Sequence, residues 1–314
     1  MRSGGVNLRS CAAWTTVELP PHTSADSYQS LTAEGASHMS QPQQSNLPIS
    51  QQPQGLPDAA RARLSGGAED GIFTSDLSVN EFVLTTQTGF QPLGLVMGTS
   101  VYHVGVQPAR WNVSQELPVL TQALYTAREL AMARMTAEAT ALGADGVIGV
   151  RLRPVQLAFS AEVIEFMAVG TAIKAEDGTS HRTPNGTPFT SHLSGQDFWT
   201  LWQHGWFPRA MVMGTCVYHV AHLSFRQALQ SYGANTELVP YTQAIYDARE
   251  LAMSRMQYEG RQVGASGIVG VNVEESTWVW GEHAVEFFSI GTAVTRSHPD
   301  RTPVDPAMVM PLTN

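Results

Sequence analysis

The sequence predicts an α+β protein made of two tandem β-α-β-β domains, each an antiparallel sheet wrapped on one long helix and preceded by a short helix. Three observations support this fold class: a long internal repeat, a helical apolar period in the middle of each copy, and apolar strand-like runs on both sides of that helix. With 314 residues, 43% of them hydrophobic, the chain is long enough to build two such domains.

The internal repeat is visible in two motifs. Met97-Gly-Thr-Ser-Val-Tyr-His-Val104 recurs 116 residues later from Met213, and Gly143-Ala-Asp-Gly-Val147 recurs 121 residues later from Gly264. The second copy therefore carries five additional residues in one loop. Two copies of this length indicate duplicated domains, because a solenoid needs shorter and more numerous units.

Each copy contains the same series of elements. Ser78 and Glu81 form a capping-box pattern that predicts the start of a short helix, and Gly89 ends it. The long helix of each copy ends at a glycine, Gly143 or Gly264. The predicted elements are strands at 93–104 and 210–220, long helices at about 118–142 and 239–263, and hairpins made by 147–157 with 161–174 and by 268–274 with 283–295.

Composition predicts the boundaries between these parts. A short helix is expected near 56–64, where Pro57 suits a first turn and Gly66-Gly67 is expected to stop the helix. The expected parts are a disordered N-terminal arm over 1–70, a first domain over 71–175, a linker over 176–189, a second domain over 190–296 and an extended C-terminal tail over 297–314.

Charge and composition exclude several classes of protein. The 27 acidic and 18 basic residues give a net charge of −9, which disfavours binding to nucleic acids or anionic membranes. No apolar run is long enough for a transmembrane segment, and the N-terminus lacks the apolar core of a signal peptide, so the cytoplasm is the expected compartment. The two cysteines, Cys11 and Cys216, are too few for a zinc site made of thiolates alone.

Three motifs of the repeat resemble a known family. They are the helix Tyr125-Thr-Ala-Arg-Glu-Leu-Ala-Met132, the Gly-Ala-x-Gly turn from Gly143, and the strand with Glu165-Phe166 and Gly170-Thr-Ala172. Together they resemble the YbjQ-like family, whose members are described as "putative heavy-metal-binding" domains, over about 93–174 and 209–295. The resemblance implies a β-α-β-β fold, ring-forming pentamers with strand contacts between subunits, and a transition metal as the only cofactor that the family name suggests.

The final strand of each copy predicts an assembly independently of this resemblance. In 163–173, which includes Val169, both alternating faces are apolar, whereas one helix covers only one face of a sheet. The other face must meet the sister domain or another chain. We expect a homo-oligomer of five chains, arranged either as one ring of alternating domains or as two stacked rings.

Several polar residues within the predicted strands are candidates for a site. Glu165 and Glu286 each lie among apolar residues, which is consistent with a metal ligand, an acid or base, or a structural partner of an arginine or a tyrosine hydroxyl. Cys216 and His219 are three residues apart, so they lie on opposite faces of a regular strand and form a poor chelate. The candidate metal ligands are His103, Glu165, Cys216, His219 and Glu286, and the candidate structural or interface residues are Tyr102, Arg128, Val169, Tyr218 and Arg249.

No catalytic residue is assigned from the sequence. The glycine-rich stretch 143–149 follows a helix, whereas a phosphate-binding loop precedes one. The preferred hypothesis is a non-enzymatic, ring-forming scaffold or binding protein, with a protein partner expected at 56–64 or at the C-terminal tail. The alternatives are a protein that binds or sequesters metal ions and, third, an enzyme that uses an interfacial glutamate with a tyrosine or histidine.

Overall fold

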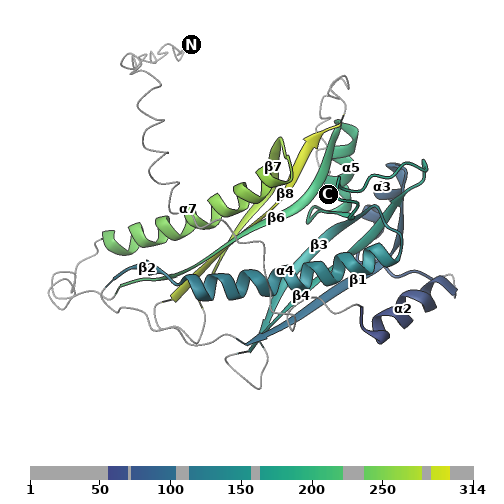
Figure 1. Cartoon of the computed structure of the whole chain (residues 1–314). Coiled ribbons are helices and arrows are strands. Elements are labelled where there is room, and N and C mark those ends of the chain that lie inside the picture. The colour runs from purple at the N-terminus through teal and green to yellow at the C-terminus, as the bar shows by residue number, and fades with distance from the viewer. Residues whose placement is uncertain are drawn as a thin grey trace, which may run out of the picture. The chain divides into compact units, whose positions relative to one another are not determined.

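The computed structural model describes residues 56–69, 72–103, 113–156, 163–221, 237–277 and 284–297 (Figure 1). The expectations for residues 1–55 and for the tail beyond 297 lie outside these ranges. Among the described residues, no helix is both long and apolar enough to cross a membrane.

The elements follow the predicted order, twice along the chain. The helices are α2 (Asp58–Glu69), α3 (Val79–Gln87), α4 (Pro118–Ala141), α5 (Gly195–Gln203) and α7 (Val239–Gln262). The strands are β1 (Phe90–His103), β2 (Gln115–Glu116), β3 (Gly146–Gln156), β4 (Val163–Ala175), β5 (Phe189–Thr190), β6 (Trp206–His219), β7 (Gly267–Thr277) and β8 (Ala284–Arg296).

Two four-stranded sheets form, with the strand orders β1-β4-β3-β5 and β2-β6-β8-β7. The three long strands of each sheet pair antiparallel in matching register: Val101 lies opposite Glu165 in the first sheet, and Val217 lies opposite Glu286 in the second. One long helix packs on each sheet, α4 on the first and α7 on the second. The predicted α+β fold class and its tandem β-α-β-β arrangement are therefore confirmed.

The long helices lie unusually close to their sheets because a glycine faces each of them. A Cβ atom added to Gly98 in β1 would collide with the carbonyl oxygen of Ala131 in α4, and one added to Gly214 in β6 would collide with that of Ala252 in α7. These two glycines explain why the Met-Gly-Thr motif occurs in both copies: each glycine provides space for the helix backbone.

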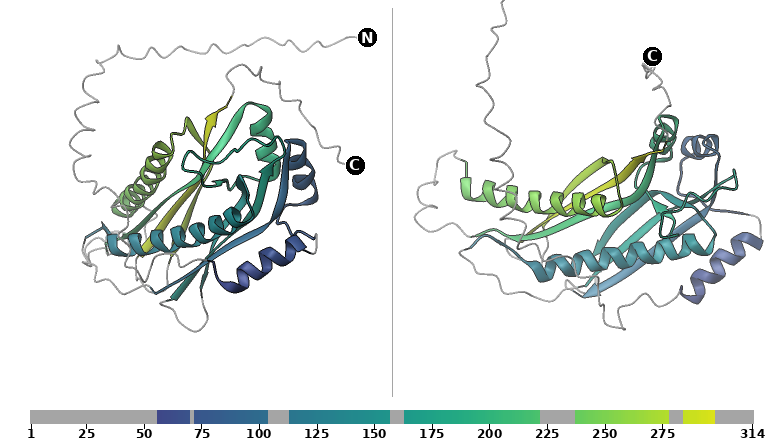
Figure 2. Two further views of the ribbon diagram at one scale, coloured as in Figure 1. Left: turned by 45° about the vertical axis from the view of Figure 1, so that its right-hand side comes forward. Right: turned by 45° about the horizontal axis from the view of Figure 1, so that its top comes forward.

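The two repeats share one hydrophobic core. Leu120, Leu124 and Met135 of α4 belong to the same buried cluster as Val217 of β6 and Phe288 of β8. The helix α4 is thus covered on one side by its own sheet and on the other by the sheet of the second repeat. These contacts give the layers in the order α7, second sheet, α4 and first sheet, and both views of Figure 2 place α7 (green) and β1 (blue) on opposite sides.

Three local features differ from the sequence-based expectation. The helix expected to stop at Gly66-Gly67 continues to Glu69, because a glycine in a helix costs only about 1 kcal/mol and Gly66 keeps a right-handed backbone. Arg63 of this helix donates to the backbone oxygen of Leu95 at 2.8 Å and forms an ion pair with Glu138 of α4.

The short strands β2 and β5 were not predicted from the sequence, because each forms by pairing with a strand of the other repeat.

Candidate functional site

A buried ion pair lies at the centre of the interface between α4 and the second sheet. Nη1 of Arg128, in α4, donates to Oε1 of Glu286, in β8, at 2.7 Å and to Oγ1 of Thr215, in β6, at 2.9 Å. The guanidinium carbon lies 4.7 Å from the ring centre of Phe166 and 4.1 Å from that of Phe288. Both charged side chains are buried, so the pair links the two repeats inside a shared apolar core.

Backbone hydrogen bonds surround this ion pair. The amide of Leu117 donates to the carbonyl oxygen of Val217 at 2.8 Å, and the amide of Val217 donates to Oγ1 of Thr121 at 2.9 Å. Beside them, Arg255 of α7 forms an ion pair with Glu116 of β2 at 2.8 Å. The start of α4 is thereby attached to the edge of the second sheet by main-chain and side-chain contacts.

The uncharged residues at this interface were not singled out from the sequence. Leu117, Thr121, Thr215 and Val217 belong to no motif with a known chemistry. Each is nevertheless identical in the two copies, with Leu238, Thr242, Thr99 and Val101 as counterparts. Identity between the copies is the signal that could have identified them.

The corresponding residues of the opposite repeat have a different environment. Glu165 lies in β4 on the face that carries Val101 and Val169, and this face is not covered by α4. Arg249 is half-buried on α7, 5.2 Å from the ring centre of Tyr246 and 5.9 Å from that of Phe287. Within the described part of the chain, neither Glu165 nor Arg249 has an oppositely charged partner.

The two tyrosines lie on the other face of each sheet. Tyr102 packs against the cluster around α4, and Tyr218 is buried beneath α7. Each tyrosine is adjacent in sequence to the valine that lies opposite a glutamate, so its side chain points to the opposite face. The structure therefore does not bring either hydroxyl to the glutamate of its own sheet.

The candidate metal ligands do not form a suitable donor set. His219 and Glu286 share a face of the second sheet, but Cys216 points to the other face, opposite Phe287. Burial raises the pKa of the Cys216 thiol to about 12, which opposes formation of the thiolate that binds metals. Glu286 already faces a guanidinium, whose positive charge would repel a cation.

The first sheet offers no better donor set. His103 is exposed at the end of β1, on the same face as the half-buried Glu165. Across the described residues, no group of three or more histidine, cysteine, aspartate or glutamate side chains is arranged to hold a metal ion. The described residues therefore do not fit the metal that the family description implies.

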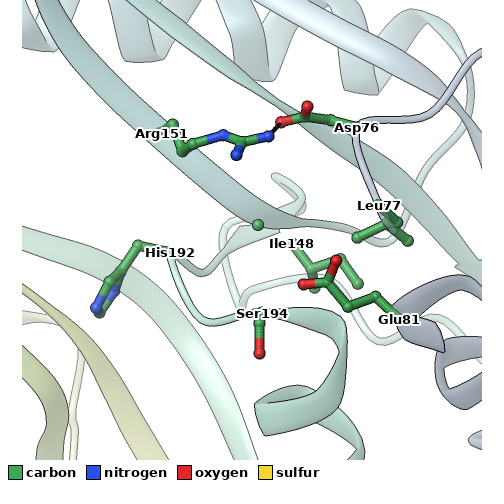
Figure 3. Close-up of a pocket in the computed structure, with 8 residues that line it drawn as sticks. Asp76, Leu77, Glu81, Ile148, Arg151, His192 and Ser194 are labelled. Carbon is green, nitrogen blue, oxygen red and sulfur yellow. Dashed lines mark ion pairs between the residues drawn. The ribbon is translucent and has the colours of Figure 1, made fainter. Parts of the chain in front are cut away.

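A small hollow of about 130 Å³ lies where the beginning of the second repeat meets β3 and α3 (Figure 3). Arg151 and Asp76 form an ion pair at its upper side in this view, and the Glu81 carboxylate faces it from α3. His192, in the segment before α5, lines the hollow, but its ring points away from the other labelled side chains. The residues that line it are Asp76, Leu77, Glu81, Ile148, Gly149, Arg151, His192 and Ser194.

The polar groups of this hollow already have structural roles. The Glu81 carboxylate accepts from the amide of Ser78 at 2.7 Å and from that of Gly195 at 3.3 Å, and hydrogen bonding with Ser78 is the largest cause of its lowered pKa. His192 bonds to the backbone oxygen of Gly270 at 2.7 Å, and burial lowers its pKa. The Ser194 hydroxyl caps α5. The hollow is thus a polar contact between the repeats rather than an arrangement of nucleophile and base.

Comparison with known proteins places the repeat in a wider group. The family model described as "putative heavy-metal-binding", YbjQ, matches residues 88–176 and 210–297. A protein of Mycobacterium tuberculosis named encapsulin nanocompartment protein Rv1762c is 51% identical over 259 residues, covering 82% of this chain and 97% of that protein.

Shorter relatives align with part of this chain. A UPF0145 protein of Thermus thermophilus is 41% identical over 91 residues, which cover 27% of this chain and 78% of that protein. A UPF0145 protein of Clostridium perfringens is 38% identical over 105 residues, which cover 30% of this chain and 97% of that protein. The two family matches together span more than half of the chain, so this protein belongs to the YbjQ family and carries its domain twice in tandem.

Proposed function

We propose that this protein is a non-enzymatic, self-assembling scaffold whose chains join into a closed ring, with five chains as the expected number. The observation that carries the proposal is the outer face of the first sheet. Val101 of β1 is 57% exposed, whereas its counterpart Val217 in the second sheet is 0% exposed because α4 covers it. An apolar sheet face without a cover favours association with another surface.

The relationship to the Mycobacterium tuberculosis protein supports self-assembly. That protein is named as a nanocompartment protein, and the similarity extends over 97% of its length. A non-enzymatic role is favoured because the conspicuous charged groups at the junction of the repeats, Glu286 and Glu81, are each held by structural partners.

Metal binding remains the second candidate, on the description of the family alone. The side chains that would supply it are divided between two faces of a sheet, and one of them, Glu286, is paired with an arginine. Metal analysis of protein purified without added metal separates the two hypotheses. Stoichiometric zinc, copper or nickel would favour metal binding over the scaffold.

Light scattering coupled to size-exclusion chromatography tests the scaffold proposal directly. The wild-type chain at micromolar concentration is expected to elute as one closed species whose mass is a multiple of 34.0 kDa. A monodisperse monomer would refute the proposal. A closed ring of another size would correct only the number five.

A further inference from the structure

We propose that the interface between the two repeats of one chain is repeated between chains, so that α7 of one chain docks on the first sheet of the next as α4 docks on the second sheet. This inference rests on the proposed self-assembly and identifies the two surfaces that carry it. In the layered arrangement of Figure 2, α7 lies at one end and the first sheet at the other, so each chain presents one half of the interface at each end.

The helix side of the internal interface is a single stripe along α4. Leu117, Thr121, Leu124 and Arg128 are spaced by four, three and four residues, and all four are buried. Their counterparts on α7 and at its start are Leu238, Thr242, Ile245 and Arg249. In the described part of the chain this second stripe is less covered than the first, since Leu238 is 39% exposed and Leu117 is 6% exposed.

The sheet side is also duplicated. Glu286, Thr215 and Val217, which receive α4, correspond to Glu165, Thr99 and Val101 in the first sheet. The strand register is the same in both sheets, so the three open residues have the same relative positions as the three covered ones. Docking α7 there places the Arg249 guanidinium of one chain against Glu165 and Thr99 of the next.

Charges at the periphery match as well. The ion pair between Arg255 and Glu116 has the counterparts Arg134 and Glu237. Arg134 donates to the carbonyl oxygen of Thr99, just as Arg255 donates to that of Thr215 at 2.7 Å, so its guanidinium is already held in the corresponding place. Glu237, at the start of α7, supplies the carboxylate that Arg134 would meet in the neighbouring chain.

The sheet edges show a second, independent match. Phe189 of β5 is 1% exposed and packs against Gly146, where an added Cβ would collide with its ring. The counterpart of Gly146 is Gly267 in β7, where an added Cβ would meet the Val294 side chain at an ordinary 4.0 Å, and the counterpart of Phe189 is Phe73, which is 46% exposed. The segment at Phe73 of the next chain therefore fits the free edge of β7 as β5 fits the edge of β3.

Both matches run in the same direction, from the second repeat of one chain to the first repeat of the next. Such a contact is heterologous, because it joins two different surfaces. It closes into a ring when the rotation from one chain to the next is a whole-number fraction of 360°. First and second repeats then alternate within one ring, in preference to two stacked rings made of one kind of repeat each.

Charge reversal in two separate chains tests the pairing. Arg249→Glu alone and Glu165→Arg alone are each expected to reduce the particle to the 34.0 kDa monomer, because each places like charges at the interface. In an equimolar mixture the two variants are expected to associate into species larger than 34.0 kDa, because a contact between unlike variants is either the native pair or its reversed form. A ring of five chains cannot alternate the two variants throughout and would keep one contact between like charges. The control Glu250→Arg, at an exposed residue beside Arg249 on α7, should assemble like the wild type.

A disulfide test of the same interface introduces no change of charge. Because Leu117 and Val217 are joined by a backbone hydrogen bond, Leu238→Cys and Val101→Cys in a Cys11→Ala background should lie within bonding range across chains. Under oxidising conditions they should give a ladder of linked chains, and a control pair at Leu238 and the exposed Val83 of α3 should not.

The possible outcomes separate the two proposals. A wild-type monomer would refute the scaffold proposal itself. If the wild type assembles, three results would each refute the proposed docking of α7 on the first sheet and leave the scaffold proposal intact. These are assembly of the single charge variants, a mixture of the two variants that stays monomeric, and a cysteine pair that gives no ladder.

Discussion

Truncating Glu286 to alanine removes the carboxylate that faces the buried Arg128 guanidinium. The arginine then keeps a hydrogen bond to Thr215 at 2.9 Å and two ring contacts, but its charge is left without a counter-ion in an apolar interior. Loss of one partner from such a pair costs about 3–5 kcal/mol of the free energy of unfolding. For a folded unit of roughly 200 residues, this corresponds to a fall in Tm of about 6–20 °C.

Differential scanning calorimetry of Glu286→Ala beside Glu274→Ala measures this cost. Glu274 is exposed on β7, and its Oε1 accepts from the side-chain amide of Asn272 at 3.0 Å. Loss of this exposed side chain should change the stability by less than about 0.5 kcal/mol. The double variant Arg128→Met with Glu286→Leu should recover most of the lost stability, because apolar side chains of similar volume replace the whole pair. Equal Tm values for the two single variants would refute the structural role of the ion pair.

Three further predictions concern other parts of the fold. Burial raises the pKa of Glu259 to about 7, above its ordinary value of 4.5. The free energy of unfolding is therefore higher at acidic pH and falls by about 2–3 kcal/mol as pH rises from about 4.5 through 7. Denaturant titrations at pH 5 and pH 8 should show this difference in the wild type and a smaller one in Glu259→Gln. Gly98→Ala should lower Tm by several degrees, because the new methyl group meets the Ala131 carbonyl oxygen, and scanning calorimetry would detect it. Val169→Asp should abolish the assembled species in light scattering, because it places a charge on the outer face of the first sheet. The control Val79→Asp, at a residue 80% exposed on α3, should assemble like the wild type. Equal masses for the two variants would contradict the role of this face.

The elements with strong local signals were predictable from the sequence. The capping box at Ser78 and Glu81 is present in the structure as expected, and the long helices end within a residue or two of the glycines that were expected to stop them. These features depend on contacts within a few residues of the chain. The predicted end of α2 was wrong because it depends on contacts with distant residues. A glycine pair is a weak stop signal when tertiary contacts, such as that of Arg63 with Leu95, hold the helix.

The difference between Glu165 and Glu286 was not predictable from local sequence. The two glutamates occupy the same place in nearly the same strand, and among the described residues only Glu286 meets an arginine. Which arginine pairs with which glutamate depends on how the repeats pack, because Arg128 reaches the second sheet rather than its own. The short strands β2 and β5 also depend on how the two repeats pack, so their own residues carry no pattern that predicts them.

The position of α4 between two sheets has a consequence for synthesis on the ribosome. When β4 is complete at Ala175, the first sheet and α4 have emerged, but the strands that cover the other side of α4 end only at Arg296. At roughly 5–20 residues per second, the stripe containing Leu124 and Arg128 waits on the order of 6–24 s for its partner. During this interval the nascent chain exposes a helix face that the finished protein buries completely, and another nascent chain on the same messenger carries the strands that would fit it. Cotranslational exchange between neighbouring ribosomes is therefore the characteristic misfolding hazard of this tandem arrangement.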